Sequence, residues 1–493
     1  MSRRLVAFGV MLASGFAGLG YQIVWTQQSA LWLGHEAAAV LAVVTAFFGG
    51  LALGALLLGG RIDRSHHPAR WYAGCELLIA AWSLLLAYTM APAGFALATL
   101  AGPEPGPWVQ GAIALGGSFL LFLPATVSMG ATLPAMARLL DQTAARRGSL
   151  GELYAANTFG AVVGVLATAF WLVPAIGLAA TASWCAALNI GCAAGALLMT
   201  RRNEPVPPLA ISPPSSRRIL WLLSATGLLG IGYEVLVVRV ISQLAENTVY
   251  TFAVLLAVYL LGTAGGAAIQ SQQARRDTVG ADAISERLLL ALAVACSVGA
   301  AALWGGPSIR NAVLGLPLAR SVVLGVTAEA AMALAAFALP TVVMGALFSH
   351  LCTQAREQGR GFGVALGVNT LGAAAAPLVF GVMLLPALGA MVALGIVVCG
   401  YLALGFWTAR RALPGRLIRV ASVAVAGVAA LTLLPALRFV DLPEGGRLLD
   451  YTEGPTAAVS VVESAEGVRV LRVDNRQQEG SSATAFVDAR QAL

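Results

Sequence analysis

Twelve runs of mostly apolar residues follow one another along the chain, and each is close to the roughly 20 residues that a helix needs to cross a bilayer. Six runs precede a long polar interruption, at residues 6–31, 38–60, 71–92, 109–136, 150–173 and 177–200. Six runs follow it, at residues 219–242, 250–270, 288–304, 322–347, 362–385 and 389–408. This pattern predicts an all-α polytopic membrane protein.

The interruption at residues 201–218 holds five prolines and four arginines, so it can neither span a membrane nor form a regular helix. It predicts a linker between a first membrane repeat, residues 1–200, and a second, residues 219–408. Residues 409–437 contain a basic linker and a thirteenth candidate span, Leu417 to Leu437. The last segment, residues 438–493, is predicted to be a short β-rich tail.

The composition fits a chain whose main solvent is lipid. Of the 493 residues, 58% are hydrophobic and only 11% are charged, whereas about 25% are charged in soluble proteins. So few charges cannot cover a water-exposed surface of this size, which excludes a conventional soluble enzyme, a disordered chain and a nucleic-acid-binding protein. The lipid bilayer is therefore the predicted partner.

The placement of basic residues predicts the orientation. All 30 are arginines, and 21 of them lie in segments that share a side of the membrane with the N-terminus, against two between spans on the other side, Arg310 and Arg320. Because short cytoplasmic loops accumulate basic residues, we expect a multi-pass protein of the plasma membrane with a cytoplasmic N-terminus. The first run lacks a small-residue cleavage site, so no cleavable signal peptide is expected.

The two sets of six runs repeat in sequence. GYQIV from Gly20 matches GYEVL from Gly232, NTFGA from Asn157 matches NTLGA from Asn369, and both pairs are 212 residues apart. Corresponding positions are six spans apart, and an even number of crossings returns the chain to the same side. The repeats are therefore predicted to be parallel, as the two halves of major-facilitator transporters are. The alternative is a duplicated helical bundle with no transport role.

Longer stretches resemble one known family. GFAGLGYQIVW, FFGGLALGALLLGGRIDR, LPATVSMGATLPAMAR and LYAANTFGAVVGVLATAFWLVPAIGL resemble the membrane part of bacterial fused major-facilitator/spermidine synthase-like proteins. The tail sequence EGPTAAVSVVESAEGVRVLRVDNRQQEG resembles the first β-strands of their spermidine synthase-like domain. The resemblance implies a bacterial inner-membrane protein, a major-facilitator-like bundle and chemistry related to polyamines.

The sequence departs from this family where the chemistry would occur. The resemblance implies a Rossmann-like domain with a Gly-rich loop for the aminopropyl donor, and no such loop follows a strand in the tail. The sequence leaves open whether this protein is an enzyme, and it predicts no catalytic residue and no cofactor. The cysteines and histidines have no companions at ligand spacing, so no metal site is predicted.

Polar side chains at membrane depth are costly and mark candidate sites. In the first run and its repeat, these candidates for lining a substrate cavity are Tyr21, Gln22, Trp25, Gln27, Tyr233, Glu234 and Arg239. Glu234 and Arg239 are five residues apart, about 140° around a helix, so we expect each to face a different partner or water. Two roles fit Tyr21 with Gln22 and Tyr233 with Glu234 equally well: lining the cavity, or hydrogen bonding between helices.

Two further sets of polar residues have separate interpretations. Asn157, Thr158, Asn369 and Thr370 are predicted to form interhelical contacts, in a layer nearer the cytoplasmic ends than Gln22 and therefore not in one site with it. Glu76 and Glu329 are single carboxylates that either couple transport to protons or pair structurally with Arg239.

These observations predict a transporter-like protein that handles a small polar, polyamine-like solute. One alternative is the membrane-anchored front half of a spermidine synthase-like aminopropyltransferase, with its catalytic part missing or supplied by a soluble transferase partner. Another alternative is a membrane scaffold for a soluble enzyme.

Overall fold

The computed structural model describes residues 3–33, 36–102, 106–140, 149–199, 217–246, 248–274, 280–317, 321–408, 435–454, 457–475 and 477–481. Most of the interruption at residues 201–218 lies outside the described residues. So does the thirteenth candidate span, apart from its last three residues.

The first six predicted runs all coincide with long helices. They form α1 (Arg3–Leu33), α2 (Glu36–Arg64), α3 (Pro68–Ala101), α4 (Pro107–Leu140), α5 (Ser149–Ala167) with the π-helical turn η1 (Thr168–Leu172), and α6 (Val173–Met199). Several helices are longer than the apolar runs: α2 ends with the mostly polar residues 61–64, and α3 continues past Pro92 through the mostly apolar residues 93–101. This half of the chain is the predicted six-helix repeat.

The second six runs also coincide with helices. They form α7 (Arg218–Ile241), α8 (Val249–Gln273), α9 (Ala281–Ala302), α11 (Ser321–Glu357), α12 (Phe362–Ala376) with the π-helical segment η3 (Pro377–Leu384), and α13 (Leu385–Thr408). The short 3-10 turn η2 (Leu303–Gly305) and the nine-residue helix α10 (Gly306–Leu314) were not predicted. They follow α9 and precede α11.

Ten helical stretches among the described residues are long and apolar enough to cross a membrane. Two of them, Leu150–Met199 and Phe362–Thr408, are far longer than one span requires. Each is broken at a glycine with a positive φ angle, 78° at Gly177 and 76° at Gly389, where an L side chain would be strained. Each stretch therefore supplies two spans, which gives the twelve that were predicted.

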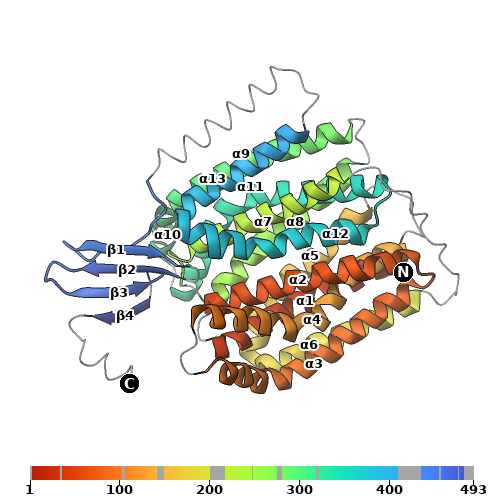
Figure 1. The fold of residues 1–493 in the computed structure, drawn as a ribbon, viewed down its shortest axis with the longest axis horizontal. Coiled ribbons are helices and arrows are strands. Elements are labelled where there is room, and N and C mark those ends of the chain that lie inside the picture. The colour runs from red at the N-terminus through yellow and green to blue at the C-terminus, as the bar shows by residue number, and fades with distance from the viewer. Residues whose placement is uncertain are drawn as a thin grey trace.

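Helix packing repeats between the halves. In the first half, α2 packs on α4, α1 on α5 and α3 on α6, and in the second half α8 packs on α11, α7 on α12 and α9 on α13. Between the halves, α2 contacts α12 and α5 contacts α8 (Figure 1). The predicted pair of parallel six-helix repeats is confirmed.

Small residues set the same close approaches in both halves. A Cβ added at Gly15 would lie 2.0 Å from the Asn157 carbonyl oxygen, and one added at Gly227 would lie 2.0 Å from the Asn369 carbonyl oxygen. Gly227 and Asn369 each lie 212 positions after their counterparts Gly15 and Asn157, which is the offset of the sequence repeat. Glycine is needed at these points because the two helix backbones touch.

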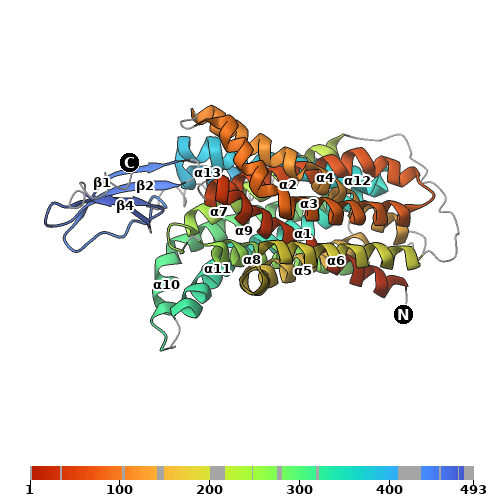
Figure 2. The same cartoon turned by 90° about the horizontal axis from the view of Figure 1, so that it is seen from below.

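The described residues of the tail form a four-stranded antiparallel sheet in the order β1 (Arg447–Glu453), β2 (Ala458–Glu463), β3 (Arg469–Val473) and β4 (Gln477–Ser481). It lies beyond the end of the bundle that is remote from the N-terminus (Figures 1 and 2). We call this the tail end, and the opposite end, where Arg218 at the start of α7 donates to the Thr408 carbonyl oxygen, the linker end. Pro435 lies at the tail end, where its carbonyl oxygen accepts from Trp304 Nε1 at 2.7 Å.

Candidate functional site

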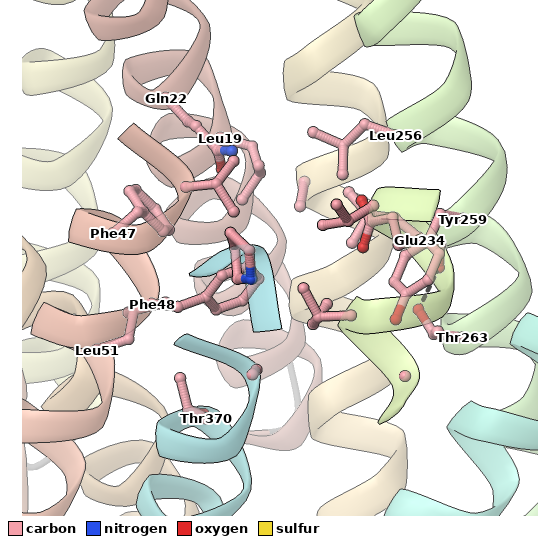
Figure 3. Close-up of a pocket in the computed structure, with 18 of the residues that line it drawn as sticks. Leu19, Gln22, Phe47, Phe48, Leu51, Glu234, Leu256, Tyr259, Thr263 and Thr370 are labelled. Carbon is pink, nitrogen blue, oxygen red and sulfur yellow. Dashed lines mark hydrogen bonds between the residues drawn. The ribbon is translucent and has the colours of Figure 1, made fainter. Parts of the chain in front are cut away.

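A cavity of about 780 Å³ lies between the two halves of the bundle. Helices of both halves line it, chiefly α1, α2, α4 and α5 on one side and α7, α8, α11 and α12 on the other (Figure 3). Most lining residues are apolar. The polar and charged ones are Gln22, Thr26, Gln27, Thr132, Tyr154, Asn157, Thr158, Thr226, Glu234, Arg239, Ser242, Tyr259, Thr263, Asn369, Thr370, Tyr401 and Asp474.

Two equivalent contacts join the halves nearer the linker end, outside the cavity lining. A Cβ added at Gly363 on α12 would lie 2.8 Å from Gly59 Cα on α2. A Cβ added at Gly151 on α5 would lie 2.0 Å from Ser271 Oγ on α8. The two pairs are related by the 212-residue repeat, so the same packing occurs on both sides of this end.

Glu234 is the acid that faces the cavity from the middle of α7. In Figure 3 its carboxylate lies beside Tyr259 and Thr263 of α8, across the cavity from Gln22 and Phe47. Within the described part of the chain, no hydrogen bond or ion pair engages this carboxylate. An ionised carboxylate in an apolar setting requires water, a proton or a cation.

Arg239, one and a half turns further along α7, has its partner in the tail. Its Nη1 donates to Asp474 Oδ1 at 3.1 Å, and its Nη2 donates to the Gly454 carbonyl oxygen at 3.2 Å. Sequence reasoning predicted that Glu234 and Arg239 face different surroundings, but it considered only Glu76 and Glu329 as acids for Arg239. It missed Asp474, because nothing in the sequence places a residue of the tail against α7.

Three of the predicted lining residues do not line the cavity. The Tyr21 hydroxyl donates to Asn189 Oδ1 at 2.9 Å inside the first half, and the Trp25 ring stacks on the Phe122 ring with 4.8 Å between the ring centroids. Tyr233 donates to the Ala336 carbonyl oxygen at 2.8 Å inside the second half. Each tyrosine points about 100° around its helix from the residue that follows it, and it is that following residue, Gln22 or Glu234, that lines the cavity.

The asparagine and threonine pairs line the cavity as well. Asn369 Nδ2 donates to the Leu223 carbonyl oxygen on α7 at 2.9 Å, which is an interhelical contact of the predicted kind. Yet Asn157, Thr158, Asn369 and Thr370 all belong to the same lining as Gln22. The two predicted layers of polar residues therefore do not form separate sites, because one cavity extends through both depths.

Glu76 and Glu329 are not among the described residues that line the cavity. Glu76 on α3 is fully buried and accepts from Ser14 Oγ at 2.7 Å and from Asn189 Nδ2 at 2.5 Å. Glu329 on α11 accepts from Thr251 Oγ1 at 2.9 Å in the first turn of α8 and from the Glu246 backbone N–H at 3.0 Å. Both carboxylates thus join neighbouring segments of their own half.

Solved structures share this arrangement of helices. A human organic anion transporter superposes with a TM-score of 0.52 at 15% identity, over 83% of this chain and 100% of that chain. A bacterial homologue of the iron transporter ferroportin, in an outward-facing state, superposes with a TM-score of 0.53 at 14% identity, over 83% of this chain and 100% of that chain. The chain has the major facilitator fold.

At these identities the likeness concerns the fold and leaves the substrate open. No protein-family model and no curated protein matches the sequence. The comparisons give no support to the predicted relation to spermidine synthase or to polyamines. The membrane-embedded fold does imply a lipid bilayer around the helices.

Proposed function

We propose that this protein transports a small organic cation through the cavity between its two halves. Glu234 is the group that binds the positive charge. The observation that carries the proposal is the position of this carboxylate, which faces the cavity without a partner among the described residues.

The remaining lining favours an organic cation over a bare metal ion. The cavity of about 780 Å³ is mostly apolar and lies within the range of roughly 300–1,000 Å³ that is typical of small-molecule sites. Tyr259 lies next to Glu234, and an aromatic ring face attracts ammonium groups. Polyamine-like solutes combine ammonium groups with methylene chains and match both features, so they are the first class to test.

The proposed orientation places the linker end in the cytoplasm. Arg4, Arg61, Arg64 and Arg218 all lie at or near the helix ends on that side. Because the bundle ends rich in arginine face the cytoplasm in most membrane proteins, the tail sheet would lie on the opposite side. The protein would then reside in the bacterial inner membrane with its N-terminus cytoplasmic.

The test is solute binding to the purified full-length protein in detergent. Putrescine, spermidine and a monoamine are compared with a sugar and a nucleoside by isothermal titration calorimetry. We expect the amines to bind and Glu234→Gln to weaken their binding by about tenfold or more, since the amide removes the charge and keeps the shape.

The matched control is Glu357→Gln, which removes one negative charge at the exposed end of α11, outside the cavity lining. We expect its amine affinity to equal that of the parent. If no amine binds, or if Glu234→Gln binds amines as the parent does, cation recognition by Glu234 is refuted. A variant that retains binding but loses the pH dependence of uptake would instead indicate a proton site.

A further inference from the structure

The tail contributes a charged residue to the cavity. Asp474 follows β3 directly, is 2% exposed and belongs to the cavity lining. It and Asn475 have positive φ angles of 47° and 61°, a backbone region that aspartate and asparagine tolerate better than other non-glycine residues. This turn brings the Asp474 carboxylate to the tail end of α7.

The sheet holds Asp474 and Arg239 together. Their side chains are 3% and 9% exposed, and Nη1 and Oδ1 are 3.1 Å apart. The backbone N–H of Ala458 on β2 donates to the same Oδ1 at 2.8 Å, so the carboxylate position is fixed from the sheet side. The neighbouring tail acid Glu453 accepts from the Tyr451 hydroxyl at 2.6 Å and is not part of the described lining.

Other contacts attach the tail to the bundle without this ion pair. Asn475 Nδ2 donates to the Gln243 carbonyl oxygen at 3.3 Å, and Gln243 Oε1 accepts from the Phe439 backbone N–H at 2.9 Å. Trp304 supplies a further contact to Pro435. Loss of the charge on Asp474 should therefore leave the tail docked.

The charges of the cavity depend on this attachment. The charged groups in the described lining are Glu234, Arg239 and Asp474, which give a net charge of minus one when all are ionised. Glu234 and Arg239 are about 7.5 Å apart along the axis of α7. Without the charge of Asp474, the Arg239 guanidinium would offset the Glu234 carboxylate and the net charge would be zero.

We propose that Asp474 is a selectivity residue of the cavity: it neutralises Arg239 and so leaves the field of Glu234 to select cations. The tail sheet is then part of the solute path. The first repeat provides an internal reference, because the residue equivalent to Arg239 is the neutral Gln27, which lines the same cavity. This inference rests on the proposed function, yet it predicts a cavity potential that is measurable without any solute.

The experiment measures that potential with a cysteine placed in the cavity, Gln27→Cys, in the otherwise intact protein. Its modification rates with a cationic and an anionic methanethiosulfonate reagent of similar size are compared as a ratio, and the parent chain without this substitution gives the background. We expect Asp474→Asn to lower the cation-to-anion ratio about a hundredfold, because one unit charge roughly 10 Å away at an effective dielectric constant near 20 changes each of the two rates about tenfold, in opposite directions.

Two further variants separate charge from folding. Arg239→Gln alone should raise the ratio about a hundredfold, because the net charge becomes minus two. Arg239→Gln with Asp474→Asn should restore the parent ratio, because the net charge returns to minus one. A ratio that Asp474→Asn leaves unchanged, or that the double variant fails to restore, overturns the proposal. Amine binding is measured in parallel: if the parent binds no amine while the ratios behave as expected, the proposed function fails and the role of Asp474 in the cavity potential stands.

Discussion

The two halves of the bundle share their helix packing but hold a carboxylate in opposite ways. In the first half, Glu76 is fully buried and accepts hydrogen bonds from Ser14 and Asn189. In the second half, Glu234 faces the cavity and has no such donors among the described residues. Glu76 thus connects three helices of its own half, whereas Glu234 is available to a ligand.

The repeat shows how this difference arises. The residues 212 positions after Ser14 and Asn189, the two donors to Glu76, are Thr226 and Tyr401, so the second half does not repeat this pair of donors. In the first half, the position equivalent to Glu234 is Gln22, an amide. Glycine contacts between helices are alike in both halves, while the polar positions differ. Packing of the repeats thus constrains the backbone approach and leaves the polar chemistry of each half free to diverge.

The largest expected effect comes from the same substitution at both acids. Glu76→Leu leaves the Ser14 hydroxyl and the Asn189 amide without their acceptor in a closed interior, which should destabilise the fold by about 2–4 kcal/mol. Glu234→Leu removes a carboxylate without protein donors and should change stability by less than about 1 kcal/mol. Thermal unfolding of both variants in the same detergent checks this difference. Equal losses would show that the two acids have the same structural role.

A second prediction exchanges the acid between the halves. Glu234→Gln should weaken amine binding about tenfold, and the added change Gln22→Glu should recover part of that loss, because residues 22 and 234 face one cavity from opposite halves. Calorimetry with the amine that binds the parent most tightly measures both effects. Gln22→Glu alone serves as the control and should tighten binding. If the exchange recovers nothing, position 22 does not share the cation site.

The architecture could be predicted from the sequence because a helix that crosses lipid must be mostly apolar along its span. Each span needs a long apolar run, so the twelve spans were predictable from the hydropathy pattern, and the parallel repeat from motif pairs that share an offset of 212 residues. The breaks at Gly177 and Gly389 also lie where the predicted spans end or begin. Boundaries were less accurate: the polar end of α11 extends past the apolar run to Glu357, and α3 continues past Pro92, where the predicted run ended, to Ala101.

The candidate site was less predictable because apolar helices do not reveal which face meets which neighbour. Gln22, Gln27, Glu234 and Arg239 line the cavity. Tyr21, Trp25 and Tyr233 were equally polar candidates and are directed into their own halves. A helix that is hydrophobic on every side has no strong amphipathic signal, so the orientation of each polar residue depends on tertiary contacts.

The contribution of the tail could not be read from the sequence at all. Asp474 belongs to no motif of the sequence, and its role depends on a turn with positive φ angles and on docking against α7. The sequence predicted a β-rich tail, and the described residues of the tail form a sheet of four strands. Contacts between segments more than 200 residues apart, such as Arg239 with Asp474, leave no local pattern.

The smallest expected effect concerns the asparagines of the repeat, where both halves have the same residue in different settings. Asn369 Nδ2 donates to the Leu223 carbonyl oxygen at 2.9 Å, whereas no hydrogen bond of the Asn157 side chain occurs among the described residues. Asn369→Ala should therefore destabilise the fold by about 1 kcal/mol, the order measured for interhelical hydrogen bonds in membranes, and Asn157→Ala by clearly less. Melting of the two alanine variants under identical conditions measures the difference.

Because both residues also line the cavity, amine binding is measured on the same samples. A loss of affinity in Asn157→Ala without a loss of stability would assign that amide to the solute. Equal melting temperatures would show that the Asn369 contact adds nothing to the packing of α12 on α7.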